Sequence, residues 1–287
     1  MRTATRMVVL NSKKYVLDLI SVRAAAAYGL RRLYASWTGA AIRVWRTPDN
    51  AVADIGFTAN GDLDTVALLA FVGSGNGFVS LYDQSGNGRH ATQTTPGSQP
   101  RIVNNGVVET KNGRPALVLS GQQFMLSTLT VAQAVAESVL TTLSAVFQSS
   151  QGVQGVLVSA QSLAGDNAYN IHAPWEDGNT YFDVLGITPR VSSPLTWDAL
   201  SVGSFVRNGA LADVYKNGLA AISSNNNPTS GTRGNQPFTL FAYRAENPVY
   251  LMVGSVSEMI FFPSSLSTTD RQILERGQGF YYNIAVN

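Results

Sequence analysis

From residue 78 onward, short runs of β-branched and aromatic residues recur along the chain, as in "FVSLYD", "LSVGSFVR" and "FTLFAYR". Many of these runs are separated by turn pairs, among them Asn112-Gly113, Asp177-Gly178, Asn208-Gly209 and Asn217-Gly218. Such pairs tolerate positive φ and favour hairpin turns whose twist matches that of antiparallel strands. Many short strands at regular spacing predict an all-β sandwich or barrel.

Helical patterns are confined to short segments nearer the two ends. In residues 21–37, apolar side chains fall at helical spacing after Ser21, with Arg31 and Arg32 on the outer side, so we expect a helix there.

Two more helices are predicted from capping residues. Asp64 is placed to cap a brief helix, "TVALLAFVG", which should end in the glycines that follow. Ser267 and Asp270 resemble a capping box for a last helix, which we expect to end at Gly277 or Gly279.

Charge and composition narrow the classes of partner. The net charge is only +2 and the basic residues are scattered, whereas nucleic-acid binding needs a concentrated basic face, so we expect no nucleic-acid partner. The absence of cysteine excludes a disulfide scaffold, thiolate zinc sites and a cysteine nucleophile. No apolar run approaches the ~20 residues of a membrane helix, so we expect no membrane insertion.

The stretch "YDQSGNGRHATQ", residues 82–93, is rich in polar groups and glycine. We interpret it as a structural turn in which carboxylate, hydroxyl and amide groups bond the backbone and glycines adopt positive φ. The turn residues are Asp83, Gln84, Ser85, Gly86, Asn87 and Gly88. The alternative makes Asp83, Asn87 and His90 ligands of Ca²⁺ or a sugar. One carboxylate is few for calcium and one histidine is a weak metal signal, so we expect no metal and no cofactor.

Three stretches taken together, 26–57, 82–93 and 254–284, resemble the concanavalin A-like, laminin-G-like jelly-roll domain of bacteriophage virion proteins. They are also similar to the catalytic domain of fungal α-L-arabinofuranosidase B, whose signature is aromatic-Asp-Gln-Ser-Gly. The resemblance covers roughly residues 20 to 284. It implies a concanavalin A-like jelly-roll β-sandwich with short N-terminal and C-terminal helices, whereas a fold alone does not fix function.

The arabinofuranosidase resemblance also implies positions for two catalytic carboxylates, as a retaining glycosidase requires. Its nucleophile is a Glu two residues after an Asp that Asp183 matches, and that position holds Leu185. Counting back from Gly254, the acid/base position falls near Asn247, with Glu246 adjacent. A leucine cannot form a glycosyl ester, so the resemblance predicts no catalytic residues and no activity.

The segment 170–186 is the best candidate for binding carbohydrate. Within nine positions it offers aromatic faces, carboxylates and an amide, supplied by Trp175, Glu176, Asp177, Asn179, Tyr181 and Asp183. The alternative is a plain hairpin that turns at Asp177-Gly178, with Phe182 in the core. Both interpretations are compatible, and His172 is expected to be a hydrogen-bonded sheet residue.

We therefore interpret residues 23–287 as one lectin-like jelly-roll domain and residues 1–22 as an N-terminal arm. The apolar "MVVL" and "YVLDLI" of the arm are suited to strand addition, which predicts contact with other virion proteins and a homo-oligomer. The predicted protein is a non-catalytic phage tail or surface-decoration component, located in the virion, that attaches to host surface glycan. The alternatives are a purely structural tail or capsid assembly protein and an arabinofuranosidase-like glycoside hydrolase.

Overall fold

β21 (Val253–Phe262) is the strand around which the fold is assembled, because both of its edges are paired. The computed structural model describes residues 15–47, 49–161, 167–186, 190–225, 233–243 and 247–287. Along one edge, β21 pairs with β12 (Leu140–Ser149), and along the other with β1 (Ala26–Gly29) and β10 (Leu117–Ser120). From β12 the first layer continues outward through antiparallel strands β17 (Ser201–Asn208), β18 (Leu211–Lys216) and β19 (Leu219–Asn225).

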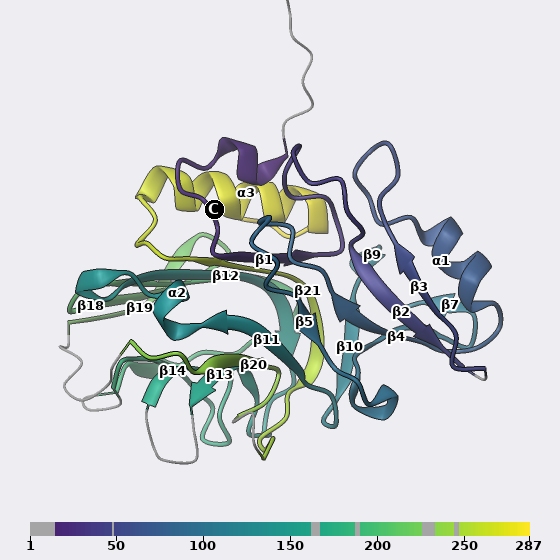
Figure 1. Cartoon of the computed structure of the whole chain (residues 1–287). Coiled ribbons are helices and arrows are strands. Elements are labelled where there is room, and N and C mark those ends of the chain that lie inside the picture. The colour runs from purple at the N-terminus through teal and green to yellow at the C-terminus, as the bar shows by residue number, and fades with distance from the viewer. Residues whose placement is uncertain (1–14, 48, 162–166, 187–189, 226–232, 244–246) are drawn as a thin grey trace, which may run out of the picture.

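A second layer lies against the first (Figure 1). Its strands, in order of pairing, are β5 (Ala91–Thr92), β11 (Met125–Thr130), β20 (Pro237–Leu240), β13 (Val156–Gln161), β14 (Asn167–His172), β15 (Asn179–Val184) and β16 (Ser192–Pro194). Aromatic rings join the layers: Phe182 of β15 meets Phe205 of β17 at 5.6 Å, and Phe238 of β20 meets Phe261 of β21 at 5.1 Å. The all-β jelly-roll sandwich predicted from the sequence is confirmed.

A group of shorter strands extends the sheet beyond β10. These are β6 (Arg101–Asn104), β7 (Val107–Val108), β4 (Gly77–Leu81), β2 (Ile42–Arg46) and β3 (Val52–Ile55), with β8 (Thr110–Lys111) and β9 (Arg114–Pro115) as a separate hairpin. Along β2 and β4, the buried residues Val44 and Val79 alternate with more exposed ones. One face of this extension therefore packs inward, and the other is open to solvent.

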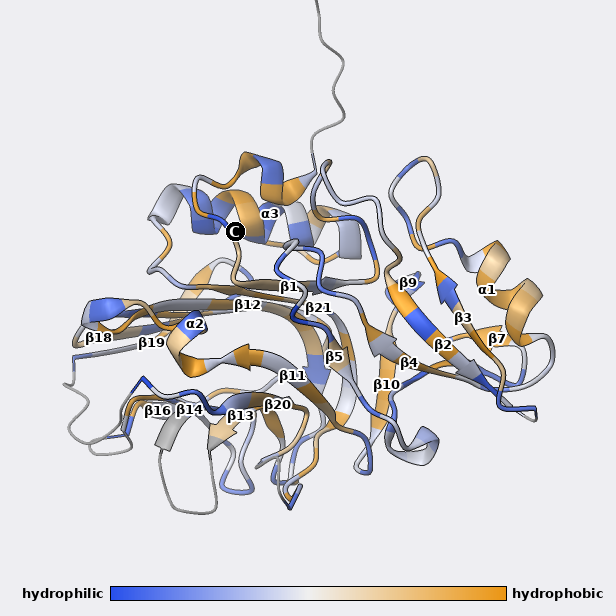
Figure 2. Cartoon of the chain, viewed as in Figure 1, coloured by the Kyte–Doolittle hydropathy of each residue, from blue (hydrophilic) through white to orange (hydrophobic). Residues whose placement is uncertain are grey.

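The helices are few and lie at the margins of the sandwich. They are η1 (Val16–Leu19), α1 (Thr65–Val72), η2 (Pro96–Ser98), α2 (Val131–Ala134), η3 (Glu137–Val139) and α3 (Thr268–Tyr282). α1 begins after Asp64, which accepts a hydrogen bond from Ala67 N, and Gly73 follows its last residue, as predicted. Figure 2 shows how hydrophobic α1 is along its length. Within the described ranges, no helix combines the length and the apolar character that crossing a membrane would take.

The predicted helix over residues 21–37 is wrong, because its centre forms β1. Ala27 donates its backbone N–H to Asp83, and β1 pairs with four residues of β21. Pairing and burial in a sheet override the helix preference of an alanine run. Arg31, expected on the outside, is buried and its Nε lies 2.7 Å from a carboxylate oxygen of Glu258.

The last helix was predicted to end at Gly277 or Gly279, and this is also wrong, because α3 continues to Tyr282. A Cβ on Gly277 would lie 2.6 Å from Val16, and one on Gly279 would lie 2.5 Å from Val286. These glycines allow η1 and the segment after the helix to pack closely against α3. The helix ends instead at Asn283, whose φ of 54° is left-handed.

The described part of the predicted arm lies on the domain itself. In η1, Val16 and Leu17 are buried in a cluster with Leu274 of α3, and Ser21 donates a hydrogen bond of 2.5 Å to Asp270. α3 in turn covers the first layer, where Gln278 bonds both Ser144 and Glu258. Residues 1–14 lie outside the described residues. The partner contact assigned to 1–22 stays a prediction.

Candidate functional site

The candidate site lies on the face of β14 and β15 that is turned away from the core. The strands pair so that Ile171 is opposite Phe182 and His172 is opposite Tyr181. Ile171 and Phe182 are fully buried in the core cluster. Because alternate residues of a strand point to opposite faces, His172, Tyr181 and Asp183 share the other face.

A tight hairpin closes one end of this face. Asp177 accepts hydrogen bonds from Asn179 N at 2.9 Å, from Asn179 Nδ2 at 2.9 Å and from the Tyr181 hydroxyl at 2.5 Å. The Tyr181 hydrogen bond is the main reason that the pKa of Asp177 is lowered. This carboxylate is thus engaged in holding the turn. Glu176 is exposed and accepts a hydrogen bond from Gln154 Nε2 at 2.6 Å.

Aromatic rings enclose His172. Its ring centroid lies 4.8 Å from that of Trp175 and 5.9 Å from those of Tyr181 and Tyr243, and Trp175 also lies 4.8 Å from Tyr250. Trp175 and Tyr181 were predicted from the sequence as site residues, whereas Tyr243 and Tyr250 were not. Those two tyrosines come from a segment some 70 positions further along the chain, and no local pattern in the sequence links them to this face.

Burial decides the charge of His172. It is 6% exposed, and burial, assisted by the nearby positive charge of Arg190, lowers its pKa to about 3. Its Nδ1 has no hydrogen-bond partner among the residues that the structure describes. The imidazole is therefore neutral near pH 7 and presents a buried, unpaired nitrogen.

Asp183 is the buried carboxylate of the site. An Arg190 nitrogen lies 2.6 Å from its Oδ2, and the Arg190 guanidinium carbon lies 3.8 Å from the centre of the Tyr181 ring. Burial raises the pKa of Asp183, whereas Arg190 and Arg207 lower it, and burial is the largest of these influences. A buried carboxyl group with a raised pKa has the property that general-acid catalysis uses.

The positions that the resemblance assigns to the catalytic pair have other environments. Leu185 has a φ of 54° and is 5% exposed in the core cluster. Asn247 is exposed, and Glu246 lies outside the described residues. Gly254 of β21 lies so close to β12 that a Cβ would lie 2.0 Å from Gln148 O. At the two positions that match the catalytic carboxylates, Leu185 and Asn247 therefore supply no carboxylate.

The stretch 82–93 forms a hydrogen-bonded turn next to β1, away from the face of β14 and β15. Asp83 is fully buried and accepts hydrogen bonds from the backbone N–H groups of Ala27, Ser85 and Arg89 at 2.9 to 3.0 Å. Gln84 donates to the carbonyls of Gly29 and Arg31 and accepts from Leu33 N, which ties the turn to the chain after β1. Gly86 and Gly88 have φ of 87° and 71°, and Asn87 bonds the carbonyl of Ala25. In the described part of the chain, no group of three or more acidic or histidine side chains is arranged to hold a metal ion.

Residues 21–162 match the family model described as the catalytic domain of α-L-arabinofuranosidase B. Among curated proteins, α-L-arabinofuranosidase B of Aspergillus niger is 39% identical over 75 residues, which cover 25% of this chain and 15% of that protein. Among solved structures, a GH54 α-L-arabinofuranosidase soaked with a cyclic sulfate inhibitor aligns with a TM-score of 0.65 at 16% identity, covering 91% of this chain and 63% of that one. An arabinofuranosidase complexed with arabinofuranosyl-α-1,2-xylobiose aligns with a TM-score of 0.63 at 16% identity and the same coverage. At these identities the structural likeness shows the fold.

These findings overturn the function predicted from the sequence. The interpretation as a non-catalytic phage tail or decoration protein is wrong, as is its virion location, because the matched relatives are Aspergillus arabinofuranosidases and the matched model is that of a catalytic domain. The prediction of no enzyme is also wrong, because the matched model is that of a catalytic domain. It rested on Leu185 and Asn247, two aligned positions that both lie outside the matched residues. The match begins at residue 21 and ends at 162, before Leu185 is reached.

The sequence match to the family model and the structural similarity both cover the first part of the chain. Residues 21–162 contain the turn at 82–93 and also β1 and β12, which pair with the two edges of β21. The chain is related to the catalytic domain of fungal α-L-arabinofuranosidase B.

Proposed function

We propose that this chain is an arabinofuranosidase-like glycoside hydrolase that cleaves α-L-arabinofuranosides on the face of β14 and β15. The observation that carries the proposal is the match of residues 21–162 to a catalytic-domain family model, on a chain whose whole fold resembles that of GH54 arabinofuranosidases. The chain spans 63% of those solved chains. The proposed activity therefore depends only on the jelly-roll sandwich, which is the part that this chain shares with those structures.

The side chains of this face support a sugar site. Trp175 and Tyr181 are half-buried aromatic residues that border His172, and aromatic faces pack against the C–H groups of a sugar ring. His172 remains neutral, so its unpaired Nδ1 is able to accept a hydrogen bond from a sugar hydroxyl. Apolar rings beside a few polar groups are typical of the lining of small-ligand sites.

Asp183 is the proposed proton donor to the leaving glycosidic oxygen. Its burial favours the protonated form, and Arg190 keeps the carboxyl group in a fixed position at the edge of Tyr181. Proton transfer from a positioned acid typically contributes a factor of about 10² to 10⁴ to the rate. The same strand places Asp183, itself buried, on the face of His172 and Tyr181, and its neighbour Phe182 in the core.

The attacking group must differ from that of a double displacement, since Leu185 cannot form a glycosyl ester. We assign the attack to water, and its activation to Glu176, which is exposed at the same hairpin. Asp177 is less suited to this role, because its carboxylate is occupied by three hydrogen bonds within the turn. Direct attack by water inverts the configuration of the anomeric carbon.

The test is release of 4-nitrophenol from 4-nitrophenyl α-L-arabinofuranoside by the full chain, with Asp183→Asn and Glu176→Gln as variants. We expect hydrolysis by the wild-type chain and a loss of about 100-fold or more in kcat for Asp183→Asn. Asp198→Asn, a conservative change at an exposed aspartate outside this face, is the matched control and should retain the wild-type rate. A wild-type chain without activity, or an Asp183→Asn variant with full activity, would refute the proposal.

A further inference from the structure

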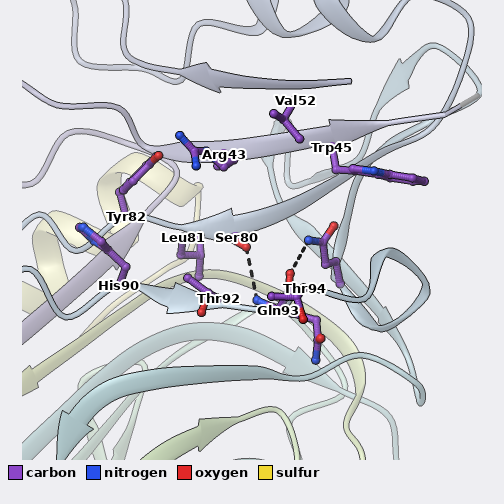
Figure 3. A pocket seen from close by; sticks show the side chains of 11 residues that line it. Arg43, Trp45, Val52, Ser80, Leu81, Tyr82, His90, Thr92, Gln93 and Thr94 are labelled. Carbon is purple, nitrogen blue, oxygen red and sulfur yellow. Dashed lines mark hydrogen bonds between the residues drawn. The ribbon is translucent and has the colours of Figure 1, made fainter. Parts of the chain in front are cut away.

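A groove lies on the outer face of β2, β4 and β5, far along the sheet from β14 (Figures 1 and 3). It has a volume of about 390 Å³, within the range of about 300 to 1,000 Å³ that is usual for ligand pockets. Figure 3 shows Trp45 and Val52 at one end and Tyr82 with His90 at the other. Neither the family match nor the candidate site gives this groove a role.

The register of two strands builds the floor of the groove. Arg43 pairs with Ser80 and Trp45 pairs with Phe78, while the intervening Val44 faces the core. The Trp45 ring is half-buried and tilted against Phe78 at a centroid distance of 5.7 Å. A supported but accessible indole offers a fixed apolar surface to a ligand at small entropic cost.

One polar group in the groove is unsatisfied. Gln99 is 8% exposed, and its Nε2 donates to the carbonyl oxygen of Gln93 at 2.5 Å. A carbonyl only accepts hydrogen bonds, so this contact fixes the orientation of the amide and leaves Oε1 without a partner among the described residues. A buried acceptor without a donor is energetically unfavourable, and a ligand hydroxyl would satisfy it.

The charge of the groove selects the class of ligand. Within the described part of the chain, Arg43 is the only Arg, Lys, Asp or Glu that lines it, and its guanidinium is bonded to Asp54 at 2.8 Å and 3.2 Å. Tyr82 also donates to Asp54. The positive charge is therefore already balanced. The other polar side chains are His90, whose Nδ1 accepts a hydrogen bond from Asp83 N, and the hydroxyls and amides of Ser80, Thr92, Thr94, Gln93 and Gln99.

From the aromatic floor, the unpaired Gln99 acceptor and the balanced charge, we infer that this groove binds a neutral oligosaccharide, separately from the face of β14 and β15. A sugar ring packs on Trp45 through its C–H groups and donates a hydroxyl to Gln99 Oε1. An anionic ligand is disfavoured, because Asp54 already occupies Arg43.

Isothermal titration calorimetry tests the inference with the full chain and three probes: arabino-oligosaccharide, xylo-oligosaccharide and the anionic oligogalacturonide. The chain carries Asp183→Asn, so that the probes are not consumed. We expect a neutral probe to bind. Trp45→Ala should weaken this binding by about tenfold or more, and Gln99→Met, which keeps the shape but removes the acceptor, should weaken it several-fold.

Trp37→Ala is the matched control, since Trp37 is also half-buried but does not line the groove. It should leave binding unchanged. Circular dichroism melting establishes that each variant is folded, and Gln99→Met decides the question if Trp45→Ala does not fold. Unchanged binding in Gln99→Met and in folded Trp45→Ala, preferential binding of oligogalacturonide, or no binding of either neutral probe would overturn the inference.

Discussion

Asp183 lies 2.6 Å from Arg190, and yet burial keeps the pKa of Asp183 raised. The two partners of this ion pair differ in exposure: the Asp183 side chain is 2% exposed, whereas that of Arg190 is 37% exposed. A solvated guanidinium is screened and compensates only part of the cost of burying a carboxylate. This relationship makes Asp183 suitable as a proton donor and gives Arg190 control over its titration.

Replacing Arg190 should therefore move the pH dependence of hydrolysis. Arg190 lowers the pKa of Asp183, so Arg190→Met should raise that pKa and keep the acid protonated to higher pH. We expect the alkaline limb of the kcat/KM profile on 4-nitrophenyl α-L-arabinofuranoside to move upward by up to about one pH unit. An alkaline limb that stays in place or moves to lower pH would argue against Asp183 as the acid.

The stereochemistry of the reaction follows from Leu185. With an apolar residue where a nucleophile would stand, water attacks directly, and the first product should have inverted configuration at the anomeric carbon. Proton NMR of the arabinose released in the first minutes, before mutarotation, reports the configuration. Initial release of the retained α anomer would mean that another carboxylate acts as a covalent nucleophile.

His172 should make stability depend on pH. Its pKa is about 3 in the folded state and 6.5 normally, so between these values the unfolded chain binds more protons than the folded one. The free energy of unfolding should fall as pH decreases from 6.5, by at most about 1.4 kcal/mol per pH unit. Urea denaturation at pH 7 and pH 5 should show a smaller decrease for His172→Gln than for wild type. Equal decreases in both proteins would mean that His172 is protonated in the fold.

The turn at 82–93 should be critical for stability. Asp83→Ala removes the acceptor of one buried and two part-buried backbone N–H donors, which should cost about 3 kcal/mol of unfolding free energy. Asn87→Ala removes an exposed amide of the same turn and should cost about 1 kcal/mol or less. Urea denaturation compares the two variants. If they were equally mild, Asp83 would not be the residue that holds the turn.

Much of the fold follows from local patterns in the sequence. Strand runs and turn pairs predicted the sandwich, and at Asn112-Gly113 and Asn217-Gly218 both residues of each pair have positive φ. The caps at Asp64 and Ser267 also lie where predicted. The helix prediction for residues 21–37 failed because Ala27 pairs with β21 and bonds Asp83, both of which are distant in the sequence.

Only part of the candidate site could be predicted from the sequence. Tyr181 and Asp183 are separated by two positions on one strand, so period-two alternation places them together. Tyr243 and Tyr250 join them through the pairing of distant segments. The raised pKa of Asp183 depends on burial, and no motif in the sequence encodes burial. For the same reason the groove at Trp45 and Gln99 has no signature in the sequence.

The central claim is that an arabinofuranoside binds on the face of β14 and β15 with its glycosidic oxygen at residue 183. A crystal structure of the Asp183→Asn variant soaked with 4-nitrophenyl α-L-arabinofuranoside tests it most directly. We predict density for the furanose beside Trp175 and Tyr181, with the glycosidic oxygen within hydrogen-bond distance of the asparagine side chain that replaces Asp183 in the variant. An empty face, or density only in the groove at Trp45, would contradict the claim.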